Sequence, residues 1–219
     1  MNRPLKIFVT GATGFVGSHL CHHLSKAGHI VYGLARSNSK FNKMNINANC
    51  VEGSLSKDKN LTFISQLPND LDAVFHTAGV VSSYDLNEFY DINYHATENL
   101  IKNLKDKYKE LNFILISSMA AAGPQATLES DVPNPVSHYG KSKLLAEKAL
   151  LTLSPRRWQK TVVRPPMIIG PGDTAVLDLF KMVKKKLILV AGLDGLNNQY
   201  SFICVFDLIQ LLQRTLDKT

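Results

Sequence analysis

Short apolar runs alternate with amphipathic segments along most of this chain. The runs have the length and composition of buried β-strands, and they lie at residues 5–9, 30–35, 46–51, 71–77, 112–117 and 161–164. Between them, apolar side chains recur at helical spacing in three segments, 15–27, 88–104 and 139–153. This alternation predicts an α/β fold, a doubly wound parallel sheet with helices on both faces.

The pattern changes after Pro165. Residues 170–173 predict a turn. A helical stripe of apolar side chains follows, made of Val176, Leu179, Phe180 and Val183. Beyond it we expect a strand at 200–205 and a last helix at 208–216.

The change divides the chain into two expected units. Residues 1–167 form the sheet domain, and residues 168–219 form a smaller lobe whose last strand and helix return to the core. Two polar segments, 36–45 and 123–137, predict loops within the first unit because they lack a periodic apolar pattern.

Three glycines follow the first apolar run directly. They stand at 11, 14 and 17, where a strand leads into a helix. In this position Gly11 allows a tight turn, Gly14 lets the backbone approach a pyrophosphate, and Gly17 lets the helix pack closely on the strand. The motif indicates a dinucleotide site at a helix N-terminus. Taken alone, it is also compatible with an ordinary strand–helix turn.

The end of the second expected strand bears on the choice of dinucleotide. NAD-binding proteins often place a carboxylate there for the ribose hydroxyls, but the segment Gly33–Ser37 contains none. Arg36 can instead pair with a 2′-phosphate, assisted by Ser37, Lys40 or Lys43. We therefore expect NADP in preference to NAD. The alternative is that Arg36 is a solvated loop arginine.

Tyr139 and Lys143 stand four residues apart at the start of an expected helix, so both lie on one face. A phenol is a poor base at neutral pH, and a nearby ammonium is expected to lower its pKa. Such a pair can exchange a proton with a substrate oxygen while hydride moves. The alternative is a helix start that holds both residues without a chemical role.

Two serines end the run at 112–117, at the carboxyl edge of the expected sheet, where doubly wound folds bind ligands. A hydroxyl there can hold a substrate carbonyl in place for proton transfer. Ser118 is the candidate for this role, and Ser117 is the candidate for a structural one.

Composition narrows the class of protein further. The 219 residues are 45% hydrophobic, enough for one well-packed core, and no apolar run is long enough to predict a membrane span. The N-terminus lacks the pattern of a signal peptide. The three cysteines, Cys21, Cys50 and Cys204, are scattered, which predicts reduced thiols in a cytoplasmic protein and no metal site.

The formal net charge of +7 comes largely from lysines, with clusters at 102–109 and 184–186. No stacking aromatic residues stand among these lysines, so we expect solvated helix faces and no nucleic-acid partner. A basic surface is still able to attract an anionic cofactor or substrate.

Five motifs occur together in the order and approximate spacing of one family, and the chain resembles the extended short-chain dehydrogenase/reductases. The similar branch contains NAD-dependent epimerases and dehydratases, 3β-hydroxysteroid dehydrogenases and dihydroflavonol reductases. The motifs that carry the resemblance are residues 10–17 (TGATGFVG), 76–79 (HTAG), Ser117-Ser118, 139–143 (YGKSK) and 164–166 (RPP).

The resemblance implies a Rossmann fold and assigns roles to individual residues. The catalytic set is Ser118, Tyr139 and Lys143, supported by Asn93. Cofactor contacts are implied for Gly11, Thr13, Gly14, Phe15 and Val16 at the pyrophosphate, Ser54 and Leu55 at the adenine, Thr77, Ala78 and Gly79 at the adenosine ribose and phosphates, and Tyr139, Lys143, Pro165 and Pro166 at the nicotinamide end. The family usually has aspartate where Ser54 stands, so this chain departs from the pattern there.

Members of the family usually run longer than this chain. The resemblance therefore implies that the lobe at 168–219 lacks the part that normally completes it, either because the chain is truncated or a fragment or because it is a naturally short member. The pocket is then open or closed by another chain. An apolar face left by the missing part would favour a homo-oligomer.

Three functions remain open at this point. The first is an NADP-dependent oxidoreductase that transfers hydride between the nicotinamide and a carbonyl or secondary alcohol of a small-molecule substrate, using the serine, tyrosine and lysine. The second is a nucleotide-sugar epimerase or dehydratase with tightly held NAD. The third is a non-catalytic NADP-binding sensor.

Overall fold

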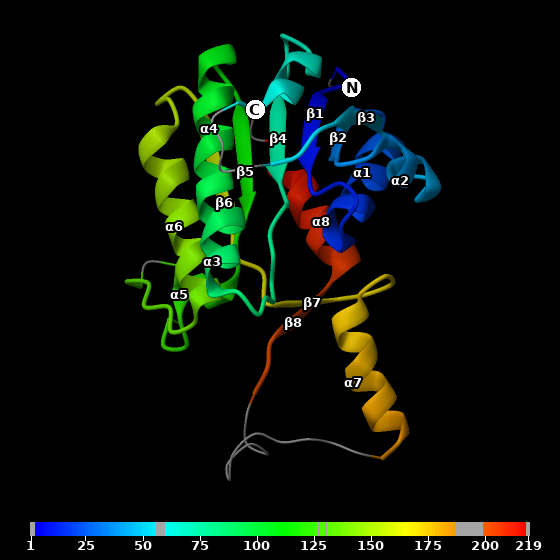
Figure 1. The fold of residues 1–219 in the computed structure, drawn as a ribbon, viewed down its shortest axis with the longest axis vertical. Helices are drawn as coiled ribbons and strands as arrows, with labels where there is room; N and C mark the ends of the chain where they lie inside the picture. Colours follow the sequence, from blue (N-terminus) through cyan, green and yellow to red (C-terminus); the bar gives the residue numbers. More distant parts are fainter. Residues whose placement is uncertain (1–2, 56–59, 127, 130, 187–198, 218–219) are drawn as a thin grey trace.

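The computed structural model describes residues 3–55, 60–126, 128–129, 131–186 and 199–217 (Figure 1). Its main sheet has six parallel strands in the order β3-β2-β1-β4-β5-β6. These strands are β1 (Lys6–Thr10), β2 (Ile30–Ala35), β3 (Asn49–Glu52), β4 (Ala73–His76), β5 (Asn112–Ile116) and β6 (Gln159–Val163). The expected doubly wound parallel sheet is confirmed, with β3 and β6 displaced by two or three residues from their expected positions.

Each face of the sheet carries its own apolar core. On one face, α4 (Ala96–Lys107), α6 (His138–Leu153) and the 3₁₀ helix η1 (Thr62–Gln66) pack on alternate strand residues such as Phe8, Val74 and Phe113. On the other face, α1 (Phe15–Lys26) and α8 (Val205–Arg214) pack on Ile7, Phe75 and Ile114. Successive strand side chains point to opposite faces, so a continuously apolar strand serves both cores.

Two segments differ from the expected elements, and a third agrees with its expectation. Residues 36–45, expected as a loop, contain α2 (Asn38–Lys43), because Ser37 caps it by accepting from Lys40 N and Phe41 anchors it in the core. The helix expected at 88–104 is interrupted. It consists of α3 (Leu86–Glu88), a π-helix η2 (Phe89–His95) and α4. The segment 123–137 contains no helix or strand in its described part, as expected.

The second unit begins with a strand that the apolar pattern did not predict. β7 (Met167–Ile169) pairs in parallel with β8 (Phe202–Cys204), the strand expected at 200–205. α7 (Thr174–Lys184) begins at this small sheet and extends away from the main sheet (Figure 1), whereas α8 returns to it and packs beside α1. Part of the expected lobe, 187–198, lies outside the described residues. The division at residue 167 stays a prediction.

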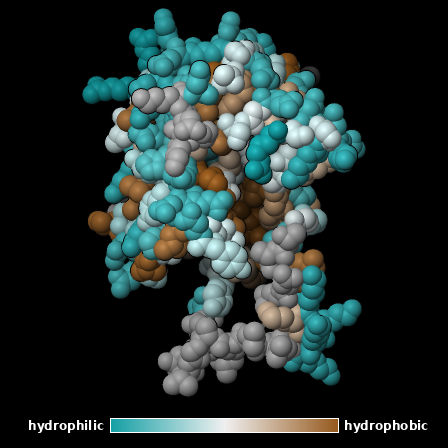
Figure 2. Space-filling view, in the orientation of Figure 1, coloured by the Kyte–Doolittle hydropathy of each residue, from teal (hydrophilic) through white to brown (hydrophobic). Residues whose placement is uncertain are grey.

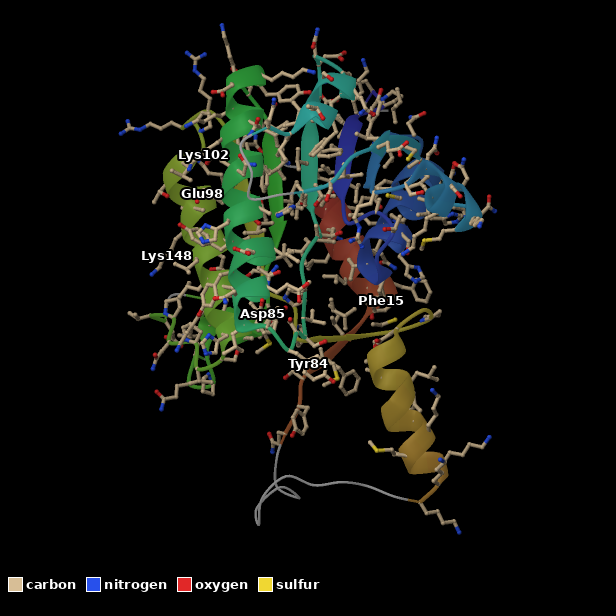
Figure 3. The ribbon with its side chains drawn as sticks, viewed as in Figure 1. Phe15, Tyr84, Asp85, Glu98, Lys102 and Lys148 are labelled. Atoms are coloured by element: carbon tan, nitrogen blue, oxygen red, sulfur yellow. The ribbon has the colours of Figure 1, made fainter. Side chains whose placement is uncertain are left out.

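The lysine-rich segment at 102–109 lies at the end of α4. Lys102 and Glu98 form an ion pair of 2.7 Å on the outer face of this helix (Figure 3). Lys107 donates hydrogen bonds to the backbone carbonyls of Ile64 and Leu67. Among the helices that the structure describes, none combines the length and apolar character needed to cross a bilayer.

Candidate active site

The candidate site lies at the carboxyl edge of the sheet, where the strand order reverses between β1 and β4. Chains leaving two such strands diverge to opposite faces, and doubly wound folds bind ligands in the crevice between them. In Figure 1 these strand ends point toward β7, β8 and α7. Figure 2 shows a hollow lined by hydrophobic atoms at this edge of the sheet. Most of the motifs identified in the sequence lie at this edge of the sheet.

The glycine turn packs against the segment that follows β4. Gly11 has a φ of +67°, and a Cβ atom added to it would lie 2.8 Å from Ala78 N. A Cβ atom added to Gly17 would lie 2.2 Å from Gly11 O and 2.9 Å from Thr77 Oγ1. Both positions therefore require glycine: the first for its backbone conformation and the second for the close approach of helix to turn.

The N-terminus of α1 fits an anionic group. Its N-cap residue, the exposed Gly14, has no side chain with which to cap the helix, and the first turn contains no acidic residue. Backbone N–H groups and the positive end of the helix dipole thus face the edge of the sheet. The half-buried Thr13, Phe15 and Val16 adjoin this point. These features suit the pyrophosphate of a dinucleotide.

Phe15 connects the glycine turn with the start of the second unit. Its ring lies edge-on to His19 at 5.7 Å, and His19 Nε2 hydrogen-bonds Pro171 O at 2.8 Å. Cβ atoms added to Gly170 and Gly172 would lie within 4 Å of the Phe15 ring. Figure 3 shows Phe15 on the side of α1 that faces β7 and α7. The turn at 170–173 therefore borders the expected cofactor position.

Tyr139 and Ser118 meet across the site. Ser137 caps α6 by accepting from Gly140 N, which places Tyr139 in the first helical turn. The Tyr139 hydroxyl lies beside Ser118, which caps α5 (Met119–Ala122). Burial raises the pKa of Tyr139, and the contact with Ser118 only partly opposes this rise. The expected lowering of this pKa by Lys143 was wrong, because burial dominates and Ser118 is the group that favours the phenolate.

Lys143 is buried one helical turn after Tyr139. Its Nζ donates a hydrogen bond of 2.6 Å to the carbonyl of Ile116, at the end of β5. A Cβ atom added to Gly79 would lie 3.7 Å from the same Nζ, so the ammonium lies between β5 and the segment after β4. Burial lowers the pKa of Lys143 to about 8, and the Glu147 carboxylate opposes this shift.

Asn93 occupies the π-helix and fastens the segment after β4. Its side chain accepts from Val80 N at 2.9 Å and donates to Val80 O at 3.0 Å. It also donates to Ser142 Oγ at 3.1 Å, and Ser142 in turn donates to the carbonyl of Tyr139 at 2.8 Å. Asn93 therefore supports the first turn of α6, which agrees with the role that the family resemblance implies.

The remaining candidates lie on either side of these groups. Arg36 is exposed at the end of β2, next to the cap of α2. Ser54 and Leu55 follow β3, the next strand outward, with Ser54 exposed and Leu55 half-buried. Pro165 is buried after β6, where its carbonyl accepts from Met119 N at 3.0 Å, and Pro166 follows it. The structure thus spreads the implied cofactor contacts along one edge of the sheet.

An ion pair behind the site was not predicted. Arg164 donates from Nε and Nη2 to the two carboxylate oxygens of Glu147, at 2.9 and 2.6 Å, and Ser117 also donates to Glu147. Glu147 is buried, so its charge requires these partners. The structural role expected for Ser117 agrees with this contact. Glu147, four residues after Lys143, was the available sequence signal.

His76 was included in the motif at 76–79, but this histidine was given no role of its own. His76 ends β4 and is only 1% exposed. Burial and the nearby Lys143 ammonium lower the pKa of His76 to about 3, so it is neutral at physiological pH. A histidine at the end of the expected strand at 71–77 was the available signal. In the part of the chain that the structure describes, no three His, Cys, Asp or Glu side chains gather into a metal-binding group.

Comparison with known proteins decides the family. The model of the NAD dependent epimerase/dehydratase family matches residues 7–219. The chain belongs to this family. Its sequence motifs and its parallel sheet agree with that membership.

Two curated relatives are named as reductases of different substrates. Ceramide reductase from Caulobacter vibrioides is 29% identical over 184 residues, which cover 84% of this chain and 52% of that protein. A putative dihydroflavonol 4-reductase from Synechocystis is 30% identical over 176 residues, covering 76% of this chain and 50% of that protein. The chain thus spans about half the length of these two curated relatives.

A solved structure shares the fold. MoeE5 in complex with UDP-glucuronic acid and NAD superposes with a TM-score of 0.80 at 25% identity. The match covers 96% of this chain and 71% of that one.

Proposed function

We propose that this chain transfers hydride between a nicotinamide dinucleotide, preferably NADP, and a carbonyl or secondary alcohol. The observation that carries the proposal is the placement of the Tyr139 hydroxyl beside Ser118, at the same edge of the sheet as the glycine turn. Bound NAD(P) would supply or accept the hydride at its nicotinamide ring. The chain's own groups then have to orient the substrate oxygen and move its proton.

Each polar group at this edge has a distinct task. Tyr139 is the acid or base at the substrate oxygen, because its hydroxyl lies beside Ser118 at the mouth of the site. Ser118 orients that oxygen through its own hydroxyl. Lys143 supplies a buried positive charge close to Gly79 and thereby favours negative charge that develops nearby. Because its pKa is raised, Tyr139 is protonated at neutral pH and carries the proton that carbonyl reduction requires.

Arg36 supports the preference for NADP. It is exposed directly after β2, at the position where a carboxylate would otherwise bind the ribose hydroxyls. Lys40 and Lys43 are exposed on α2, the helix that begins two residues later. An arginine with two neighbouring lysines favours a 2′-phosphate.

The second candidate function is that of a nucleotide-sugar epimerase or dehydratase with retained NAD. It is favoured by the family to which the chain belongs and by the NAD and UDP-glucuronic acid in the MoeE5 complex. In that case Tyr139 would accept the proton of a sugar hydroxyl as hydride passes to the bound NAD, and it would return the proton when the hydride returns to the sugar carbon. NAD that remains bound through dialysis would favour this candidate over the first.

An assay with both reduced cofactors tests the proposal. Purified chain is mixed with a panel of aldehydes and ketones and with NADPH or NADH, and consumption of the cofactor is followed by absorbance. We expect turnover with NADPH to exceed turnover with NADH. Arg36→Ala is expected to raise the KM for NADPH about 10–100-fold, since an arginine–phosphate contact contributes roughly 1.5–3 kcal/mol, with little effect on NADH.

Arg3→Ala provides the matched control, because Arg3 pairs with Asp72 at the opposite edge of the sheet. It should leave the ratio of NADPH to NADH turnover unchanged. Equal KM changes for both cofactors in Arg36→Ala would contradict the assignment of Arg36. Conversion of a nucleotide sugar without net cofactor consumption would establish the second candidate instead.

The pH dependence of turnover should reflect Lys143. Its pKa of about 8 means that the ammonium is present below this pH and is lost as the pH rises through it. We therefore expect kcat/KM for NADPH-dependent reduction to fall above about pH 8. The pKa of Tyr139 is raised above its ordinary value, so its own titration belongs at higher pH. A profile that stays flat up to pH 10 would show that the Lys143 charge is not required.

A further inference from the structure

Four buried groups form one continuous line of hydrogen bonds behind the candidate site. Thr10 Oγ1 lies 2.7 Å from His76 Nδ1, and His76 Nε2 lies 2.7 Å from Thr97 Oγ1. Thr97 Oγ1 lies 2.8 Å from the carbonyl oxygen of Asn93. We call Thr10, His76, Thr97 and this carbonyl the His76 network. All four residues are at most 1% exposed.

The direction of each hydrogen bond follows from the number of protons available. A carbonyl only accepts, so the single hydroxyl proton of Thr97 is donated to Asn93 O. Thr97 Oγ1 must then accept from His76, which places the imidazole proton on Nε2. A neutral imidazole has one N–H, so Nδ1 accepts from the Thr10 hydroxyl. Thr10 Oγ1 in turn accepts from Ala78 N at 3.3 Å.

The two ends of the network lie at the two halves of the site. At one end, Thr10 and Ala78 adjoin Gly11, because a Cβ atom added to that glycine would meet Ala78 N at 2.8 Å. At the other end, Asn93 holds Val80 and Ser142 with its side chain, and Ser142 donates to the carbonyl of Tyr139. The network therefore runs from the glycine turn to the first turn of α6.

At this end of the network, Asn93 lies in the π-helix η2. Ala96 N bonds to Asp91 O, five residues earlier, which widens the helix next to Asn93. The Thr97 hydroxyl donates to the Asn93 carbonyl four residues earlier, a contact that threonine also makes in regular α-helices. Such π-helical turns often occur at functional sites because they redirect individual side chains and carbonyls.

We propose that His76 is a positioning residue that, as its Nε2–H tautomer, holds the glycine turn and Asn93 in the geometry that Tyr139 requires. The proposal rests on the proposed oxidoreductase function. His76 touches neither the expected substrate nor the cofactor position; it acts through Thr10 at one end and through Thr97 and Asn93 at the other. If His76 only filled space in the core, it would be equally buried, but its function would not require one particular tautomer.

The tautomer is measurable without turnover. ¹⁵N-detected NMR of the histidine side chains separates protonated from unprotonated ring nitrogens, and the His76 signals are identified by their absence from a His76→Asn variant. We expect Nε2 protonated and Nδ1 unprotonated from pH 5 to 8. A proton on Nδ1, or a cationic ring within that range, would overturn the proposal whether or not the chain is an oxidoreductase.

The positioning role is tested by removing one hydroxyl. Thr97→Val keeps the shape of the side chain but leaves His76 Nε2–H and Asn93 O without this partner. We expect kcat per cofactor-binding site to fall about tenfold, since small misplacements of reacting groups cost this much or more. The KM for the carbonyl substrate should change less than about twofold. Thr97→Ser, which retains the hydroxyl, is expected to recover most of the rate.

A second threonine supplies the control. Thr152 Oγ1 donates to Lys148 O at 2.8 Å, the same contact with a carbonyl four residues earlier, but on the exposed face of α6. Thr152→Val should leave kcat and the His76 tautomer unchanged. If Thr97→Val lowers the melting temperature while kcat per cofactor-binding site stays at the wild-type value, the network is only structural and the proposal fails.

Discussion

Replacing Tyr139 with phenylalanine is expected to lower turnover about 10²–10⁴-fold, the usual contribution of a positioned acid or base. The substitution removes only the hydroxyl beside Ser118 and leaves the ring, which packs at 6.1 Å from Phe89. NADPH binding should therefore stay within about twofold of the wild type. Steady-state rates and a fluorescence titration with NADPH measure the two quantities separately.

Tyr90→Phe is the matched control for this prediction. The Tyr90 hydroxyl also bonds the start of α6, at 3.1 Å from His138 Nδ1. Its described hydrogen-bond partner is therefore His138 and not Ser118. We expect its turnover to remain within about twofold of the wild type. Equal losses of turnover and of NADPH affinity in Tyr139→Phe would contradict the assignment of Tyr139 as the acid or base.

Replacing Gly17 with alanine is expected to abolish tight cofactor binding and to destabilise the fold by roughly 1–3 kcal/mol, the usual cost of overpacking. The new Cβ would lie 2.2 Å from Gly11 O and 2.7 Å from Gly11 C. These are backbone atoms, so the turn itself has to move away from α1. The N–H groups that face the expected pyrophosphate would then lose their arrangement. A titration with NADPH measures the loss of cofactor affinity, and urea unfolding measures the loss of stability.

Gly28→Ala separates loss of stability from loss of binding. Gly28 follows the opposite end of α1, and a Cβ atom there would meet nothing within 4 Å. Its φ of +91° makes alanine unfavourable, at a cost of roughly 1–2 kcal/mol. This variant should lose stability but retain its affinity for NADPH. If both variants weaken binding equally, the glycine turn has no specific role in holding the cofactor.

Much of the fold was predictable because its elements repeat a simple local pattern. The continuous apolar run at 112–117 became β5, which is buried on both faces. The helical spacing in 139–153 became α6 with a displacement of one residue. The segment at 36–45 was mispredicted because only one of its apolar side chains, Phe41, anchors α2, and the capping contribution of Ser37 was overlooked.

The positions of several candidate residues were predictable from the sequence, and their electrostatics were less so. Helical periodicity correctly placed Tyr139 and Lys143 one turn apart on α6, and Ser118 does lie beside Tyr139. The direction of the Tyr139 pKa shift was not predictable from this spacing. It depends on how deeply the phenol is buried and on Ser118, which reaches the site from a different part of the chain.

By itself, the sequence determined the order of strands and helices, the glycine turn and the residue types available for chemistry. These properties depend on neighbours a few positions apart. The tertiary structure alone decided that Thr10, His76 and Thr97 form one hydrogen-bonded line and that Glu147 pairs with Arg164. Such partners lie far apart in the chain and meet only when strands and helices pack, so no local pattern of residues specifies their distances or their burial.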